Sequence, residues 1–308
     1  MSNLGPILAA LLPLFALIVA GAVLQRLDFP GGDFWSRLER LIYYVLFPAL
    51  LVEGLATADV AASQLPGMVA ATTLTILAMS AALFALRPLL RVDGPGLTSV
   101  YQGAVRFNTY LGIAIALALY GEPVMAPAAL VLALLIPLVN VGSVLMLTIY
   151  AGGATDAGAL ARGLARNPLI LACLAGLALN LTGIGLNTHL ASLLDIAGSA
   201  AVPLGLMTVG AGLRLSRVWR DAGTLVQTTV LKLALMPAVA WLAAGLFALD
   251  TLETRALVLI AALPTAPSAY ILARQMGGDH RLVASILTLQ TAAAAVTLPV
   301  VLSLLERA

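Results

Sequence analysis

The sequence predicts an all-helical membrane protein with ten transmembrane helices. Hydrophobic residues make up 61% of its 308 residues and charged residues only 10%, whereas a soluble globular chain has about 45–50% apolar and about 25% charged residues. Long apolar runs recur along the chain, each near the roughly 20 residues that a helix needs to cross a bilayer. These runs leave no stretch long enough for a sizeable soluble domain.

Ten apolar runs follow one another, separated by charged residues, glycine and proline. The expected helices cover residues 6–25, 38–56, 65–87, 97–121, 124–150, 167–184, 196–213, 223–248, 254–276 and 281–305. The first run lacks a positively charged start, so we interpret it as a membrane helix and not as a cleaved signal peptide.

The arginines predict the orientation of these helices, because short loops rich in Lys and Arg stay on the cytoplasmic side. Arg255 and Arg307 fall on one side of the membrane. The loops on the other side, after the odd-numbered spans, hold Arg26, Arg37, Arg40, Arg87, Arg91, Arg162, Arg166, Arg214, Arg217, Arg220 and Arg281. We therefore expect both termini on the external side, in the inner membrane of a bacterium.

Several classes of function are disfavoured by composition. A net charge of +2 gives no surface of the kind that nucleic acid requires. The single cysteine, Cys173, excludes an intramolecular disulfide and is interpreted as a small hydrophobe. His189 and His280 are the two histidines, and the chain has no His-Glu-x-x-His or Gly-x-Ser-x-Gly motif, so an intramembrane enzyme is a weak alternative. We expect no cofactor and no metal site.

The second half of the chain repeats the plan of the first. Pro48 in span two matches Pro203 in span seven, and Asn108 in span four matches Pro264 in span nine at nearly the same offset. Because each half holds five spans, an odd number, the halves enter the membrane in opposite directions. We therefore expect two inverted five-helix repeats, residues 1–150 and 151–308, which is transporter architecture. Chance alignment of apolar helices is the alternative.

Spans four and nine are expected to break near the middle of the membrane. In span nine, Pro264 and Pro267 each remove an amide donor and clash with a carbonyl one turn earlier, so an unbroken helix would cost about 3 kcal/mol at each proline. In span four, Asn108 and Thr109 are helix-cap residues, but no proline enforces a break. Unwound backbone at this depth must be buried in protein or line a wet cavity. A simple kink is the alternative.

The two breaks predict a binding site for an anion. The second half of each broken span begins near the bilayer centre, and such a helix start favours an anion by about 0.3–1 kcal/mol. Asn140 and Gln290 belong to the spans that flank the breaks. The candidate substrate-binding residues are Asn108, Thr109, Tyr110, Gly112, Asn140, Pro264, Thr265, Ala266, Pro267, Ser268 and Gln290.

Two basic residues are expected to support this site electrostatically. Lys232, the single lysine, lies inside span eight, where a charge costs about 2.5–3.5 kcal/mol and therefore needs polar partners or a wet cavity. Arg106 lies beside the break of span four. The alternatives are a lysine that reaches the membrane interface and an arginine that only marks a cytoplasmic vestibule.

A set of motifs in this order resembles the auxin efflux carrier family. The motifs are YVLFPALL at 44–51, FNTYLG at 107–112, NP at 167–168, LKLALMP at 231–237 and LPTAPSA at 263–269. The likeness covers nearly the whole chain and is that of a compact bacterial member, because plant members carry a long hydrophilic loop where this chain has about residues 151–166. Plant members also have a proline at the fourth-helix break, where this chain has Asn108 and Thr109.

The resemblance implies a fold shared with bile-acid symporters and sodium/proton antiporters. It implies a scaffold domain from helices 1, 2, 6 and 7, a transport domain from helices 3–5 and 8–10, crossed helices 4 and 9, and a homodimer through the scaffold helices. It also implies an elevator-type carrier of organic carboxylates such as auxin-like acids, malate or malonate. The alternatives are a sodium-coupled organic-anion symporter and, less favoured, an enzyme or a sensor without transport.

Overall fold

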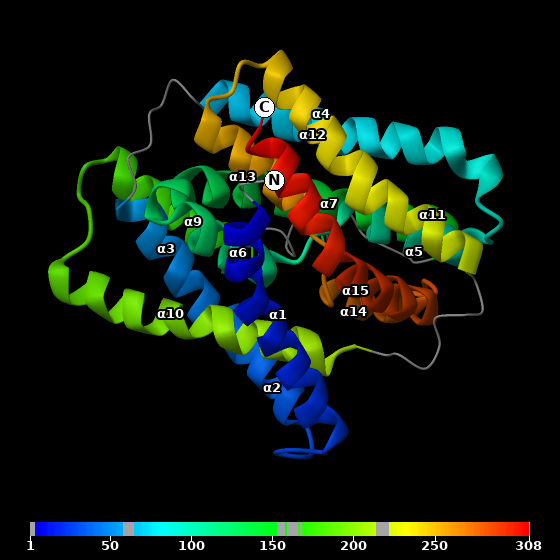
Figure 1. The fold of residues 1–308 in the computed structure, drawn as a ribbon, viewed down its shortest axis with the longest axis horizontal. Helices are drawn as coiled ribbons and strands as arrows, with labels where there is room; N and C mark the ends of the chain where they lie inside the picture. The colour runs from blue at the N-terminus through cyan, green and yellow to red at the C-terminus, as the bar shows by residue number, and fades with distance from the viewer. Residues whose placement is uncertain are drawn as a thin grey trace.

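The computed structural model describes residues 4–57, 65–152, 158, 166, 168–213 and 222–307. Across these ranges the regular elements are helices, and no strand occurs (Figure 1). Eight segments are long and apolar enough to cross a membrane: Gly5–Arg26, Phe34–Thr57, Leu65–Leu89, Gly94–Tyr120, Glu122–Tyr150, Thr188–Ala211, Ala222–Leu246 and His280–Leu305. The expectation of an all-helical, multi-pass membrane protein is therefore confirmed.

Two of the ten expected spans fall short of this length. The sixth corresponds to α9 (Pro168–Leu181), which has 14 residues. The ninth is divided into α13 (Thr251–Ala262) and α14 (Ser268–Met276), of 12 and 9 residues, because the chain leaves the helix between them. Length and composition therefore support eight spans. The count of ten stays a prediction.

The uninterrupted spans are helices whose apolar residues face in every direction. They are α1 (Leu4–Arg26), α4 (Leu65–Leu86), α7 (Met125–Tyr150), α10 (Thr188–Ala211) and α15 (His280–Leu305). On α1, for example, Leu11 is buried whereas Leu12 is exposed. A helix that is apolar all round suits a bilayer, since lipid accepts the side chains that face away from the protein. Short 3₁₀ turns, η3 (Arg87–Leu89) and η4 (Glu122–Val124), lie at helix ends.

Two spans contain a π-helical turn before a proline. The first runs through α2 (Phe34–Leu41), η1 (Ile42–Leu46) and α3 (Phe47–Thr57), and the second through α11 (Ala222–Val230), η6 (Leu231–Leu235) and α12 (Met236–Leu246). Pro48 and Pro237 each follow the π turn after one residue. Each proline lacks an amide donor and crowds the carbonyl of the preceding turn, and a π turn relieves this locally without ending the helix.

The helices form two packed groups that meet around the middle of the molecule. In one group α1 packs along α10, and α3 packs against both α9 and α10. In the other, α4 packs against α7 and α12, and α5 (Gly94–Val105) packs against α7 and α15. Figure 1 shows α3, α9 and α10 on one side and α4, α5, α11 and α15 on the other. The helix α6 (Thr109–Tyr120) contacts α1 and α10 across this division.

Some of the predicted features fall outside the described part of the chain. They are Arg162, Arg214, Arg217 and Arg220 of the predicted cytoplasmic loops, and Asn167 of the NP motif.

Candidate functional site

Both expected helix interruptions are present, and they touch each other. Residues 106–108 separate α5 from α6, and residues 263–267 separate α13 from α14. The backbone N–H of Asn108 donates to the carbonyl of Pro264 at 2.8 Å. Each interruption thus satisfies a backbone group of the other, which is how non-helical backbone is tolerated inside a membrane protein.

The break between α5 and α6 is formed without a proline. Arg106 and Asn108 both have extended backbone conformations, and the side-chain oxygen of Asn108 accepts a hydrogen bond from Leu111 N at 3.2 Å. This contact caps α6 and replaces one of the bonds that the start of a helix lacks. The break between α13 and α14 coincides with the two prolines, since α13 ends at Ala262 and α14 starts directly after Pro267.

Gln290 of α15 holds both interruptions in place. Its fully buried side chain accepts a hydrogen bond from Thr265 N at 2.9 Å and donates to the carbonyls of Gly103 at 3.0 Å and Thr228 at 3.4 Å. The hydroxyl of Thr265 donates to the carbonyl of Gln102 at 3.3 Å. One amide therefore links α15, α11, the end of α5 and the break before α14.

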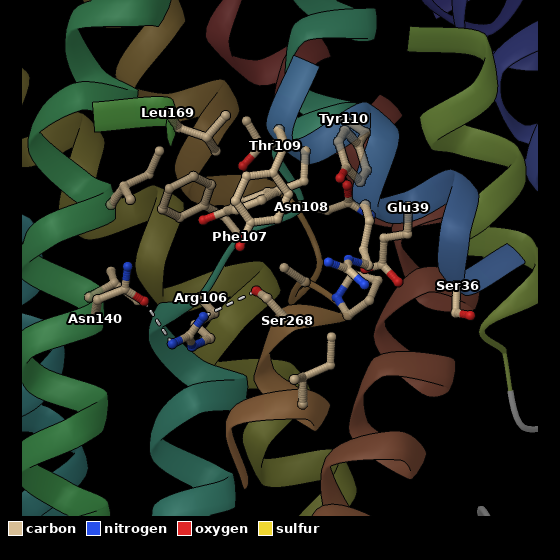
Figure 2. A pocket seen from close by; sticks show the side chains of 18 residues that line it. Ser36, Glu39, Arg106, Phe107, Asn108, Thr109, Tyr110, Asn140, Leu169 and Ser268 are labelled. Carbon is tan, nitrogen blue, oxygen red and sulfur yellow. Dashed lines mark hydrogen bonds between the residues drawn. The ribbon is translucent and has the colours of Figure 1, made fainter. Parts of the chain in front are cut away.

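A cavity of about 670 Å³ opens beside the two interruptions (Figure 2). Its walls come from α2 and η1 on one side, and from the two interruptions, α6, α7, α9 and α14 on the other. The lining residues are Ser36, Glu39, Arg40, Tyr43, Tyr44, Arg106, Phe107, Asn108, Thr109, Tyr110, Ile136, Val139, Asn140, Leu169, Ala266, Pro267, Ser268 and Ile271.

Arg106 is a buried cation in this cavity wall. It is 7% exposed, and its guanidinium donates to the Ser268 hydroxyl at 3.1 Å and to the Asn140 side-chain oxygen at 2.9 Å, as the dashed lines in Figure 2 show. Its Nε has no hydrogen-bond partner, and among the described residues no carboxylate pairs with it. A buried guanidinium with neutral partners keeps its positive charge uncompensated, so it attracts an anion strongly.

A second donor in the cavity wall also lacks a partner. Asn108 is fully buried, and while its side-chain oxygen caps α6, its Nδ2 has no hydrogen-bond partner. A buried donor without a partner costs about 1–3 kcal/mol. A bound acceptor group, such as a carboxylate oxygen, would recover that cost.

The cavity contains part of the predicted site. Arg106, Asn108, Thr109, Tyr110, Asn140, Ala266, Pro267 and Ser268 line it. Pro264, Thr265 and Gln290 lie outside the lining. Pro264 and Thr265 belong to the second interruption, where the Pro264 carbonyl accepts from Asn108 N and Thr265 N donates to the Gln290 side chain. Gly112 also lies outside it, and a Cβ added there would come within 2.6 Å of the Leu263 side chain, so this glycine allows α6 to pack against the second interruption.

Lys232 lies away from the cavity lining. It is 0% exposed within η6, and its Nζ lies 2.8 Å from the sulfur of Met236. Its side chain is enclosed by the protein and does not extend to the molecular surface, as a snorkelling lysine would. Its predicted support of the site would have to act through space rather than by contact.

One wall of the cavity was not predicted from the sequence. Ser36, Glu39, Arg40, Tyr43 and Tyr44 come from α2 and η1, and the apolar residues Ile136, Val139, Leu169 and Ile271 complete the lining. Phe107 lies within the interruption between α5 and α6, and it could have been predicted because it belongs to the FNTYLG motif. The remaining lining residues are distant in sequence from the predicted site. Among them, the pair of tyrosines before Pro48 in an apolar span was the one sequence feature that could have indicated a polar wall.

Comparisons with known proteins agree with this architecture. Residues 157–302 match the family described as "Membrane transport protein". Over 273 residues the chain is 27% identical to the "Putative malonate transporter" of Rhizobium meliloti (strain 1021), covering 86% of this chain and 85% of that protein. The chain is a membrane transporter. The resemblance to the auxin efflux carrier family is thereby confirmed, and these matches indicate a transporter and not an enzyme.

Proposed function

We propose that this transporter carries small organic carboxylate anions through the cavity beside the two interruptions. The observation that supports this most is Arg106, a buried guanidinium in the cavity wall that no described carboxylate neutralises. The relative from Rhizobium meliloti, whose name refers to malonate, is consistent with a carboxylate substrate.

In this proposal the carboxylate binds where three kinds of donor converge. Arg106 offers its unpaired Nε–H, Asn108 offers its unpaired Nδ2, and the first amides of α6 and α14 add their positive helix ends. Asn140 and Ser268 hold the guanidinium, and Ile136, Val139 and Leu169 contact the apolar part of the substrate. The interruptions are held in place outside the cavity lining by the hydrogen bonds of Gln290, Thr265 and Pro264 and by the close packing at Gly112.

We propose that the site moves by an elevator-type mechanism. The scaffold domain would comprise α1, α2, η1, α3, α9 and α10, and the transport domain α4 to α7 and α11 to α15, as the two packed groups suggest. The division corresponds to ten spans arranged as two inverted repeats. The cavity includes the exposed residues Ser36 and Arg40 of α2, which the arginine distribution assigns to the cytoplasmic side, so this conformation would be inward-facing.

The proposed location follows the same arginine distribution. The chain would lie in a bacterial inner membrane with both termini outside, and the scaffold helices would form the contact in a homodimer.

Replacing Arg106 tests the proposed function. Arg106→Gln keeps a hydrogen-bonding side chain but removes the charge, and a hydrogen bond to a charged group contributes about 1.5–3 kcal/mol. We expect affinity for a transported carboxylate to fall by about 10-fold to 100-fold, with a smaller loss for Arg106→Lys, which keeps the charge without the planar fork. Binding and uptake of labelled malonate and labelled arylacetic acids by reconstituted vesicles measure this effect.

Arg274→Gln is the matched control, because Arg274 lies on α14 but is exposed and does not line the cavity. It should retain the affinity of the original protein. Unchanged carboxylate affinity in Arg106→Gln would contradict the proposal. Uptake that requires sodium would favour the sodium-coupled symporter, whereas binding without uptake would favour a sensor.

A further inference from the structure

Tyr110 forms the part of the cavity wall where the two packed groups of helices meet. It lies in the first turn of α6 and lines the cavity. On one side its ring meets the edge of the Phe47 ring, with centroids 5.0 Å apart and planes at 71°. Phe47 is fully buried at the start of α3, so the Tyr110 ring cannot move far in that direction without disturbing the core.

Gly205 of α10 lies against the Tyr110 ring on another side. A Cβ added at Gly205 would lie 2.8 Å from Cγ and 2.9 Å from Cδ1 of Tyr110. Carbon atoms do not approach this closely, so the Tyr110 ring would have to shift if residue 205 had a side chain. Gly205 is buried and does not line the cavity itself.

The Tyr110 ring also borders the cavity, whose lining includes it. Phe47 closes one direction, and α10 closes another. A side chain at position 205 would displace the ring away from α10, and because Phe47 blocks one direction, we expect the displaced ring to narrow the cavity that Arg106 and Asn108 also line. The absence of a side chain at position 205 keeps that space open.

We propose that Gly205 is a specificity-determining residue that sets the width of the cavity through Tyr110. This inference rests on the proposed function, because it concerns the size of the carboxylate that the site accepts. Gly205 lets the Tyr110 ring lie back against α10, which leaves room for a carboxylate with a bulky apolar body. The residue acts on substrate size and not on the recognition of the anionic group.

The first experiment compares Gly205→Ala with the original protein for a small and a bulky competitor. We expect Gly205→Ala to weaken the binding of an arylacetic acid by about tenfold, in line with the loss that one methylene group causes in a fitted pocket. The affinity for malonate, a smaller molecule that needs a less wide cavity, should change by less than about twofold. Equal losses for both competitors would overturn the inference.

Gly198→Ala is the matched control for damage to α10. Gly198 lies on the same helix, and a Cβ added there would meet Leu50 Cα at 2.9 Å, away from the cavity lining. This variant should alter stability but keep the ratio of the two affinities. The double variant Gly205→Ala, Tyr110→Ala lacks the Cγ and Cδ1 atoms that the added Cβ would meet, so it should bind the bulky competitor more tightly than Gly205→Ala alone. A double variant without recovery would show that the effect does not pass through the ring.

A second readout does not depend on which substrate the protein carries. Thr109→Cys introduces a thiol in the cavity wall, in a Cys173→Ala background that removes the native buried cysteine. Adding Gly205→Ala should lower the rate at which a bulky thiol reagent modifies this cysteine at least about fivefold more than the rate for a small reagent, since a narrowed cavity excludes the wider molecule. An unchanged ratio of rates would overturn the inference. If no carboxylate binds the original protein, the proposed function fails, and this ratio still decides the role of Gly205.

Discussion

Arg106 and Lys232 are both buried basic side chains, but their surroundings give them different roles. The guanidinium of Arg106 has polar partners, Ser268 and Asn140, and faces the cavity. The amine of Lys232 lies beside the Met236 sulfur and outside the cavity lining. A buried charge without a carboxylate carries a large desolvation cost, and a charge in surroundings of low dielectric acts over a longer distance than one in water.

Lys232→Met tests the electrostatic support predicted for this residue. Methionine keeps the length and apolar stem but removes the charge, so we expect the melting temperature to rise and carboxylate affinity to fall about twofold to fivefold, the range of a favourable charge at a distance. Binding and thermal unfolding of the purified protein measure both effects.

Met236→Leu is the control for Lys232→Met, because it changes the neighbour that Lys232 contacts without changing charge. We expect it to leave affinity unaltered. If Lys232→Met binds as well as the original protein, the lysine has no part in anion binding.

At the scale of elements, the interruptions depend on side chains from other helices as much as on their own prolines. The break after α13 has Pro264 and Pro267, yet its backbone N–H at Thr265 is satisfied by Gln290 of α15. The break after α5 has no proline and relies on the cap by Asn108 and on the bond from Asn108 N to the Pro264 carbonyl. The two breaks therefore stabilise each other.

Gln290→Leu should destabilise the pair of interruptions. The substitution keeps the approximate volume but leaves the N–H of Thr265 and the carbonyl of Gly103 without partners, and each such buried group costs about 1–3 kcal/mol. We expect the free energy of unfolding in detergent to fall by about 2–4 kcal/mol, with weaker carboxylate binding.

Thr291→Val provides the comparison for Gln290→Leu. Thr291 is the next residue on α15, is also buried, and donates only to the Leu287 carbonyl of its own helix. Its loss should cost about 1 kcal/mol or less. Similar losses in the two variants would argue against a special role for Gln290.

Replacing Pro264 and Pro267 together by alanine removes the steric reason for the second break. We expect α13 and α14 to join more readily, and carboxylate affinity to fall by about tenfold or more because the start of α14 and Ser268 would leave the cavity. Affinity measurements show the loss. A double variant that binds normally would show that Gln290 and Asn108 suffice to maintain the break.

At the scale of the whole molecule, the contact between α6 and α10 joins the two packed groups beside the cavity. Tyr110 Cβ lies 3.1 Å from a Cβ built at Gly205. If the groups move past each other during transport, this contact must change in every cycle. A covalent link at this point would then stop transport.

A cysteine pair at positions 110 and 205, in the Cys173→Ala background, tests the movement. The Cβ separation of 3.1 Å is slightly below the roughly 3.5–4.5 Å of a disulfide, so oxidation should form the bond after a small outward shift and should abolish transport until a reductant is added. The pair at 50 and 198 is matched, because Leu50 Cβ also lies 3.1 Å from a Cβ built at Gly198 but both residues belong to the same packed group. Oxidation of that pair should leave transport intact. Continued transport by the oxidised 110–205 pair would rule out sliding at this contact.

The amino-acid sequence alone determined the membrane environment, the helical class and the positions of both interruptions. These features follow from local properties: apolar runs long enough to span lipid, two prolines that an unbroken helix does not tolerate, and a cap at Asn108. The motif also identified Arg106 and the residues around it, because they are close to one another along the chain.

The tertiary structure alone decided which polar groups face the cavity and which face backbone. Gln290 and Asn140 lie in spans that flank the breaks and look alike in sequence, yet Gln290 bonds to backbone while Asn140 lines the cavity. Likewise, nothing near Gly205 in the sequence indicates that it borders the Tyr110 ring. These outcomes depend on how helices distant in sequence rotate and pack, and an apolar helix without a polar face carries little information about its rotation.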